Sequence, residues 1–328
     1  MKDRGPLLQV DDLRVWFDVK PHGAMPWTRP DKLKAVDGVS FTLEAGETLG
    51  IVGESGCGKS TLARAVMRMV PAETGRVLWL GEDLLGLSRR EMRGHRKEMQ
   101  MIFQDPLASL DPRMTIGQIV AEPLRTHFPE LDATEVKARV RAALDRVGIL
   151  PNMINRYPHE FSGGQCQRIG IARALIVKPQ LIICDEPVSA LDVSIQAQVI
   201  NLLMEIQKEM GLSLIFIAHD LSVVKHISDR VMVLYLGNVM EISESSQLYK
   251  SPGHPYTEAL ISAVPIPDPK ANRGREVLLL DQDLPSPLDP PSGCVFRTRC
   301  PIAEPRCAAV KPELRDRGNG QWVACLVR

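Results

Sequence analysis

One run of consecutive residues has the types and the order that bind a phosphate chain. Gly53-Glu54-Ser55-Gly56-Cys57-Gly58-Lys59-Ser60-Thr61 fits the pattern G-x-x-x-x-G-K-[ST]. Glycines in such a loop let backbone N–H groups turn inward around phosphate oxygens. Lys59 reaches the β- and γ-phosphates, and the hydroxyl of Ser60 is a ligand for Mg²⁺. The sequence therefore predicts a nucleotide-phosphate site at residues 53–61.

A pair of carboxylates forms a second candidate group. Asp185 and Glu186 directly follow the apolar run Leu181-Ile182-Ile183-Cys184. Asp185 is suited to hold Mg²⁺, directly or through water, on the γ-phosphate side. Glu186 is suited to polarise an attacking water as a general base. Two acids at the end of a strand are common by themselves, but downstream of a phosphate loop they favour nucleotide hydrolysis.

A third group combines a helix start with glycines. Ser162 is suited to be the N-cap of a helix, and Gly163 and Gly164 leave backbone N–H groups exposed at its positive end, beside Gln165. This segment is therefore a second candidate anion site. Because one chain has no use for two separate cradles for one γ-phosphate, we expect a dimer in which this segment closes over the nucleotide of the other chain.

The elements that must position these groups alternate between strand and helix. Residues 105–160 are expected to be helical, with an apolar stripe at helical spacing from Val136 to Val147. Such alternation predicts an α/β fold with a mainly parallel sheet and helices on both faces. The expected strands are 7–19, 36–43, 48–52, 75–80, 99–103, 181–184, 214–218 and 231–236, and the main expected helices are 62–69, 165–176 and 195–210.

Composition narrows the class of protein. The chain has 328 residues, 40 Lys and Arg against 40 Asp and Glu, and therefore a formal net charge of zero. This balance gives no general attraction to nucleic acid, and no nucleic-acid partner is expected. No apolar run approaches the roughly 18 residues of a membrane span, and no secretory signal is visible, so we expect the chain to stay in the cytoplasm. From Pro252 onward, 12 of the 25 prolines predict a mostly irregular appendage.

The three groups occur in the order and spacing of ATP-binding-cassette (ABC) ATPases, and the chain resembles that family. The resemblance implies ATP and Mg²⁺ as cofactors and a cassette at residues 1–250: a RecA-like P-loop core, an antiparallel β subdomain and a helical subdomain at about 105–160. It implies that Gln104 touches Mg²⁺, that Ser189-Ala190-Leu191-Asp192 couples the two ATP sites of a dimer, and that His219 contacts the γ-phosphate. It places Phe17 against adenine, with neighbouring Trp16 as the competitor.

Longer strings resemble the peptide-importer subfamily, including the F-type ATP-binding subunits of bacterial oligopeptide permeases. They are Met101 to Pro106, Ser109 to Met114, Arg156 to Ser162, Ser251 to Thr257 and Pro291 to Arg297. The resemblance implies a peripheral subunit at the cytoplasmic face of the bacterial inner membrane. Its implied partners are a second ABC ATPase subunit, expected to be a paralogue in a heterodimer, two multispanning permease subunits and an extracytoplasmic peptide-binding protein. Importers of dipeptides and of nickel are close relatives, so the transported ligand stays open.

The C-terminal extension, residues 251–328, carries Cys294, Cys300, Cys307 and Cys325, spaced C-x5-C-x6-C-x17-C. Four thiols in a proline-rich segment with little core of its own suggest a metal that holds it together. The short C-x2-C pairs usual in zinc sites are absent from the sequence. Resemblance to peptide-importer ATPases implies a [4Fe–4S] cluster on the four thiolates. Zinc, and free thiols in a small fold, remain alternatives.

Two functions of other classes compete with the importer subunit. A soluble ABC ATPase acting in translation or DNA repair usually has two cassettes in one chain or a long coiled-coil insert, and this sequence shows neither. A nonhydrolysing regulatory subunit would be expected to lack hydrolytic residues, but both Glu186 and His219 are present. The sequence therefore favours an active ATPase subunit.

Overall fold

The structure, a computed structural model, describes residues 5–20, 23, 25, 27, 29–264 and 284–328. The chain folds into two compact units. The first unit takes in residues 1–43, 49–85 and 218–328, and the second takes in 44–48 and 86–217. Both units draw on separate stretches of sequence, so each is held together by contacts between distant segments. The predicted domain boundary at residue 250 stays a prediction.

An antiparallel sheet forms one layer of the first unit, in the order β2-β1-β4-β5. Its strands are β1 (Leu8–Val19), β2 (Asp31–Leu43), β4 (Thr74–Trp79) and β5 (Glu82–Asp83). In β1 the fully buried residues Leu8 and Val10 alternate with less buried neighbours, but the next buried residue is Leu13. A register shift between Val10 and Leu13 absorbs the extra residue, and Asp12 there has a φ of 42°. This β-bulge restores the apolar face of the strand.

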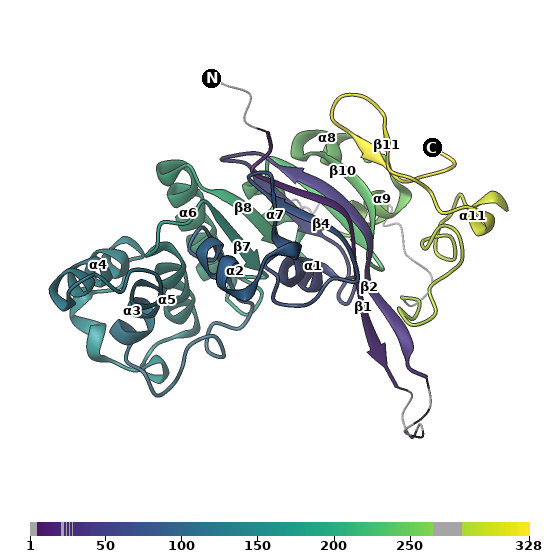
Figure 1. Cartoon of the computed structure of the whole chain (residues 1–328). Helices are drawn as coiled ribbons and strands as arrows, with labels where there is room; N and C mark the ends of the chain where they lie inside the picture. The colour runs from purple at the N-terminus through teal and green to yellow at the C-terminus, as the bar shows by residue number, and fades with distance from the viewer. Residues whose placement is uncertain (1–4, 21–22, 24, 26, 28, 265–283) are drawn as a thin grey trace. The chain divides into compact units, whose positions relative to one another are not determined.

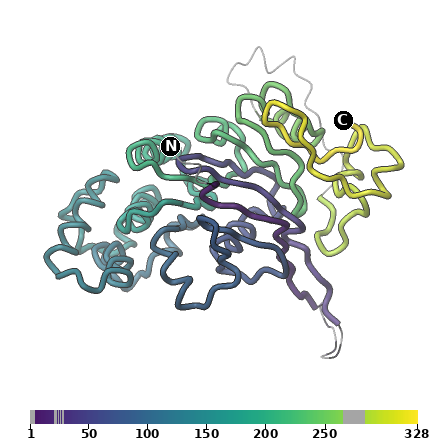
Figure 2. Tube along the Cα trace, turned by 45° about the horizontal axis from the view of Figure 1, so that its top comes forward, coloured from purple at the N-terminus to yellow at the C-terminus, as the bar shows by residue number. Residues whose placement is uncertain are grey.

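The first unit also contains a run of strands in the order β11-β12-β10-β9-β3. β3 (Thr48–Val52) and β9 (Arg230–Tyr235) are parallel, whereas β10 (Asn238–Glu244) and β12 (Trp322–Val323) are added antiparallel. The last strand, β11, is Arg315–Asp316. β12 pairs with β10 through Trp322 and Val323, and Figure 2 shows the yellow C-terminal chain beside part of the green chain. The helices of this unit are α1 (Lys59–Val66), α7 (Leu221–Ile227), α8 (Ser245–Lys250), α9 (Pro255–Ser262) and α11 (Arg306–Ala309).

Parallel strands and helices make up the second unit. β8 (Ser213–Ile217), β7 (Leu181–Asp185) and β6 (Met99–Ile102) lie side by side in that order. α3 (Ile116–His127), α4 (Ala133–Arg146) and α5 (Gly163–Leu175) pack on one another (Figure 1). The remaining helical elements are α2 (Arg89–His95), α6 (Val193–Met210) and the short 3₁₀ turns Pro151–Asn155 and Pro158–Glu160; a further turn, Leu84–Gly86, links the units.

The predicted α/β alternation is confirmed, and the differences have physical reasons. The predicted helix 195–210 is Val193–Met210, and the predicted strand 214–218 is Ser213–Ile217. β10 was not predicted. Its sequence NVMEISE has a glutamate at its centre, yet six of its seven residues are buried. The tail also contains α9, which the prediction of a mostly irregular appendage did not include.

Glu241, the glutamate inside β10, is fully buried and holds the C-terminal extension by hydrogen bonds. Its two carboxylate oxygens accept from the backbone N–H groups of Gly253 and His254, each at 2.9 Å, and from Nε2 of Gln321 at 2.8 Å. Burial lowers the pKa of His254 to about 3, helped by the positive charge of Arg328, so that imidazole is neutral. Its Nδ1 accepts from the N–H of Tyr256 at 3.0 Å.

We expect Glu241→Gln to destabilise the first unit. The amide would turn an –NH₂ group toward N–H donors, leaving buried groups unpaired at a cost of roughly 1–3 kcal/mol. Urea unfolding followed by circular dichroism measures this loss. Glu258→Gln is the matched control, because Glu258 pairs with Arg328 at the surface of the same extension. Equal stability of the two variants would contradict the assigned role of Glu241.

Candidate functional site

The phosphate loop lies between β3 and α1 in the first unit. Backbone carbonyl groups of two other strands, β9 and β2, lie close to it. A Cβ atom at Gly53 would lie 2.2 Å from the carbonyl oxygen of Leu234, and one at Gly58 would lie 2.1 Å from that of Ala35. Gly53 and Gly58 also have φ angles of 154° and 104°. Only glycine fits these positions, so the glycine pattern of the sequence reflects steric contact as well as backbone freedom.

Lys59 begins α1 and is almost fully buried. Its Nζ donates to the carbonyl oxygens of Gly53 at 2.8 Å and Glu54 at 3.0 Å, so the ammonium group is held within the loop. Cys57 in the same loop is buried, and burial raises the pKa of its thiol, although the Lys59 charge opposes this. The loop therefore presents a fixed cation and no thiolate, as an anion site requires.

The loop also has contacts with two residues that the sequence analysis did not connect with it. The hydroxyl of Tyr256 accepts from the N–H of Glu54 at 3.0 Å, and Arg299 forms an ion pair with the Glu54 carboxylate. Both residues come from the C-terminal extension. The sequence contains little indication of these two contacts, because neither Tyr256 nor Arg299 belongs to a nucleotide-binding motif.

Other predicted residues of the first unit are placed as follows. His219 is exposed and precedes Asp220, whose side chain caps α7 by accepting from the N–H of Ser222. Phe17 and Trp16 are both half-buried in β1. Nζ of Lys34 lies 5.3 Å from the centre of the Trp16 ring, a cation–π contact. The assignment of adenine stacking to Phe17 stays a prediction.

The second unit holds the carboxylates. Asp185 is the last residue of β7 and is fully buried. Glu186 follows with a φ of 48°, and its N–H donates to the carbonyl oxygen of Ile217 at 3.1 Å. Nε2 of Gln104 donates to Glu186 Oε2 at 3.0 Å. The structure therefore brings together the predicted general base and the glutamine predicted to touch Mg²⁺, and the positive φ of Glu186 fits a constrained functional position.

The predicted second anion segment caps α5 in the same unit. Ser162 Oγ accepts from the N–H of Gln165 at 3.4 Å, while Gln165 Oε1 accepts from the N–H of Ser162 at 3.0 Å. This capping box confirms the predicted helix start. A Cβ atom at Gly164 would lie 2.5 Å from Ile195, so α5 and α6 approach closely there. Asp192 precedes α6 and its carbonyl accepts from the N–H groups of Ile195 and Gln196.

The four C-terminal cysteines belong to the first unit. Cys294 and Cys307 are buried and Cys300 and Cys325 are half-buried. Burial raises the pKa of the Cys294 thiol to about 11; a backbone hydrogen bond from Phe296 opposes this, and the proximity of Cys307, Cys300 and Cys325 adds to it. The Cys294 N–H also donates to the carbonyl oxygen of Cys307 at 2.8 Å. Cys294 and Cys307 are thus neighbours, but across the described ranges no three His, Cys, Asp or Glu side chains are grouped so as to hold a metal ion.

A helix that crosses a membrane must be both long and apolar. Among the residues described, every helix is too short or too polar to cross a bilayer.

Comparison with known proteins gives two family matches. Residues 36–189 match the family described as ABC transporter, and residues 240–307 match the family described as Oligopeptide/dipeptide transporter, C-terminal region. The second match spans most of β10, all of α9 and three of the four C-terminal cysteines.

Relatives match over nearly the full length. The chain is 64% identical over 99% of its length, and 97% of the relative, to the Oligopeptide transport ATP-binding protein OppF of Salmonella typhimurium. It is 64% identical over 98% of its length to the protein of that name in Escherichia coli, covering 96% of it. A putative oligopeptide transport ATP-binding protein of Bacillus subtilis is 54% identical over 98% of this chain and 95% of its own.

Solved structures share the fold. cbiO1 from Clostridium perfringens, described as part of an ABC transporter complex, matches with a TM-score of 0.63 and 28% identity over 75% of this chain and 91% of its own. The ATP-binding cassette MJ0796, solved as a dimer bound to ADP and Pi, matches with a TM-score of 0.64 and 25% identity over 73% of this chain and 98% of its own. The predicted cassette fold is confirmed.

Proposed function

The chain belongs to the ABC transporter family, and we propose that it is the ATP-binding, ATP-hydrolysing subunit of a bacterial oligopeptide importer. The observation that carries this proposal is the 64% identity, over 99% of the chain, to a protein named for oligopeptide transport. The match of residues 240–307 to a C-terminal region named for oligopeptide and dipeptide transporters favours peptides over nickel or another small ligand.

The arrangement within each unit supports the predicted chemistry. Lys59 and the loop N–H groups would offset the charge of the γ-phosphate, while Ser60, Gln104 and Asp185 would hold Mg²⁺. Glu186 would orient the attacking water, and its hydrogen bond to Gln104 at 3.0 Å holds the carboxylate in one orientation. His219 would contact the γ-phosphate. No described carboxylate other than Glu186 accepts a hydrogen bond from Gln104, which supports its choice as the base.

We propose that two cassettes sandwich two ATP molecules, with Ser162 to Gln165 and Asp192 of one chain facing the nucleotide of the other. The capped start of α5 supports this role, because its N–H groups form a positive helix end. The second cassette would be a paralogue, giving a heterodimer. Two multispanning permease subunits and an extracytoplasmic peptide-binding protein complete the proposed complex, with this chain at the cytoplasmic face of the inner membrane.

An affinity pull-down from mild-detergent extracts tests the importer function. With this chain as bait, mass spectrometry should identify two multispanning proteins, a second cassette and a solute-binding protein whose bound ligand names the cargo. A control extract from cells lacking the tag removes background proteins. Recovery of ribosomes or DNA-repair factors in place of membrane proteins would overturn the transport function and leave the ATPase chemistry standing.

We expect Glu186→Gln to lower ATP turnover by about 10²–10⁴-fold, because the amide cannot accept a proton from the attacking water. ATP binding should persist, and the closed dimer should accumulate in size-exclusion chromatography with ATP. Glu135→Gln is the control, since Glu135 is an exposed residue of α4 paired with Arg139. Unchanged turnover in Glu186→Gln would refute the assignment of the base.

We further propose that Cys294, Cys300, Cys307 and Cys325 hold a [4Fe–4S] cluster with a structural or regulatory role. The hydrogen bond from the Cys294 N–H to the carbonyl oxygen of Cys307, which brings two of these residues together, supports a shared site. All four donors are thiols, the ligand type that such clusters prefer.

Iron content decides among the alternatives for the thiols. Protein purified without oxygen should contain iron and acid-labile sulfide, and Cys294→Ser should lose both. Cys166→Ser is the matched control, because Cys166 is buried in α5, outside this group. Zinc without sulfide, or a metal-free protein with reactive Cys300 and Cys325, would contradict the cluster.

A further inference from the structure

The C-terminal extension contacts the phosphate loop through a nearly buried ion pair. Nη1 of Arg299 lies 2.9 Å from each carboxylate oxygen of Glu54. The side chain of Arg299 is 7% exposed and that of Glu54 is 25% exposed. The two residues are 245 positions apart in the sequence, so this contact exists only in the folded chain. Solvent screens such a pair much less than it screens a surface pair.

Aromatic rings fix the position of Arg299. Its guanidinium carbon lies 5.9 Å from the centre of the Tyr235 ring, within cation–π range. Tyr235 packs edge-on against Tyr256, with 4.8 Å between ring centres, and against Phe296, with 5.3 Å. All three rings are fully buried. The guanidinium is therefore held against a rigid aromatic wall that faces Glu54.

Glu54 connects this ion pair to the lysine of the loop. Its N–H donates to the hydroxyl of Tyr256 at 3.0 Å, and its carbonyl oxygen accepts from Nζ of Lys59 at 3.0 Å. Glu54 is also the acidic residue of the loop in which the phosphates of ATP would bind. A carboxylate there repels a nucleotide phosphate unless a cation compensates its charge.

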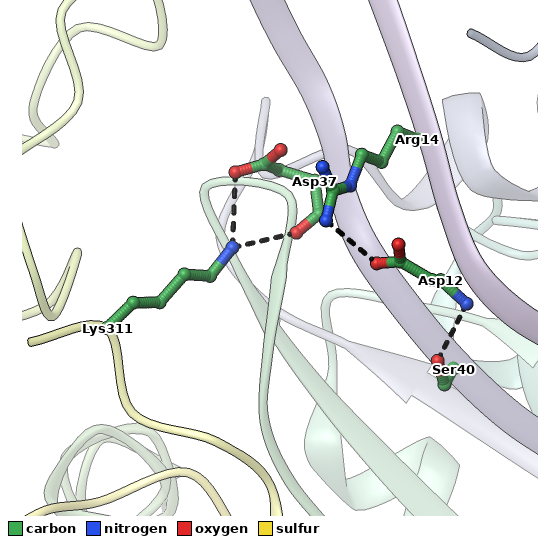
Figure 3. Close-up of polar contacts among 5 residues, drawn as sticks. All are labelled: Asp12, Arg14, Asp37, Ser40 and Lys311. Carbon is green, nitrogen blue, oxygen red and sulfur yellow. Dashed lines mark hydrogen bonds and ion pairs between the residues drawn. The ribbon is translucent and has the colours of Figure 1, made fainter. Parts of the chain in front are cut away.

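A second, weaker link to the loop starts at Lys311 of the same extension, whose contacts with Asp37 are drawn in Figure 3. Nζ of Lys311 donates to the backbone carbonyl of Asp37 at 3.0 Å and to its carboxylate at 3.2 Å. The N–H of Asp37 donates to the carbonyl of Gly237, and the N–H of Gly237 donates to the carbonyl of Cys57, each at 2.8 Å. Lys311 is half exposed, so its ion pair contributes little energy by itself. The buried Arg299 pair is the stronger of the two contacts.

We propose that Arg299 is a positioning residue for ATP binding, acting through Glu54. It neutralises the Glu54 carboxylate and fixes the backbone segment whose carbonyl accepts from Lys59. The nucleotide then meets a loop without uncompensated negative charge. This role rests on the proposed binding of ATP at Lys59, and it makes nucleotide affinity depend on the folded extension.

A purely structural role for Arg299 makes a different prediction. If Arg299 only fastens the extension to the cassette, its loss should lower stability and leave the affinity of the folded protein for ATP unchanged. If Arg299 compensates charge, its loss should weaken ATP binding, and removal of the Glu54 charge should restore it. The second substitution therefore separates the two roles.

The experiment measures MgATP binding to the full-length chain by isothermal titration calorimetry, with Tm from differential scanning fluorimetry. We expect Arg299→Ala to raise the Kd by about tenfold. The double variant Arg299→Ala with Glu54→Gln should return to within about threefold of the wild-type Kd. Arg299→Lys should also stay within about threefold, because one nitrogen of Arg299, Nη1, makes both contacts with Glu54 and an ammonium group can take its place. Arg306→Ala is the matched control, because Arg306 forms an exposed ion pair with Glu304 inside the same extension.

Several outcomes would overturn the proposal. One is an unchanged Kd in folded Arg299→Ala, and another is a double variant as weak as Arg299→Ala alone. If Arg299→Ala does not fold, a tenfold loss of affinity in Arg299→Lys would contradict charge compensation, and an affinity near that of wild type would support it. The Lys59→Ala variant is expected to bind no MgATP. If the wild-type protein also bound no MgATP, the proposed function itself would be refuted, and this inference would be refuted with it.

Discussion

The close approach of backbone to the phosphate loop is the constraint on which the first unit depends. Gly53 touches the carbonyl of Leu234 in β9, and Gly58 touches that of Ala35 in β2. A strand of each sheet thus packs against the loop, and a side chain at either glycine would push one of them away. The loop geometry that suits phosphate is therefore enforced by the packing of both sheets, and not by the loop residues alone.

The same unit has buried charges that tie the extension to the cassette. Glu241 in β10 receives three N–H donors from the extension, and Arg299 of the extension pairs with Glu54. Each pair is costly to desolvate, and the surrounding donors or rings must offset that cost. Once formed, such contacts allow one arrangement of the extension, because any shift would leave a buried charge without a partner.

Much of the cassette could be predicted from the sequence, because its signals are local. The glycines of residues 53–61, the apolar run before Asp185 and the capping box at Ser162 each lie within a few residues, and the structure places a loop, a strand and a helix start there. β10 could not be predicted, because Glu241 interrupts its apolar pattern and is stabilised only by donors from residues 253–254 and 321. The Arg299–Glu54 pair could not be predicted either, since only the tertiary fold brings it together.

The contrast between local motifs and contacts made only by the tertiary fold also indicates how the extension can act on the nucleotide site. Residues that touch the nucleotide occupy short motifs, because a loop or a strand end fixes their backbone directly. A residue that compensates the charge of such a motif can lie anywhere in the sequence. It needs only a rigid support that faces the motif in the folded chain. The wall of Tyr235, Tyr256 and Phe296 is that support for Arg299. Arg299 also lies directly before Cys300. A change at the thiols that moved the segment of Arg299 and Cys300 would therefore change the charge beside the phosphate loop without a change in any residue of the loop itself.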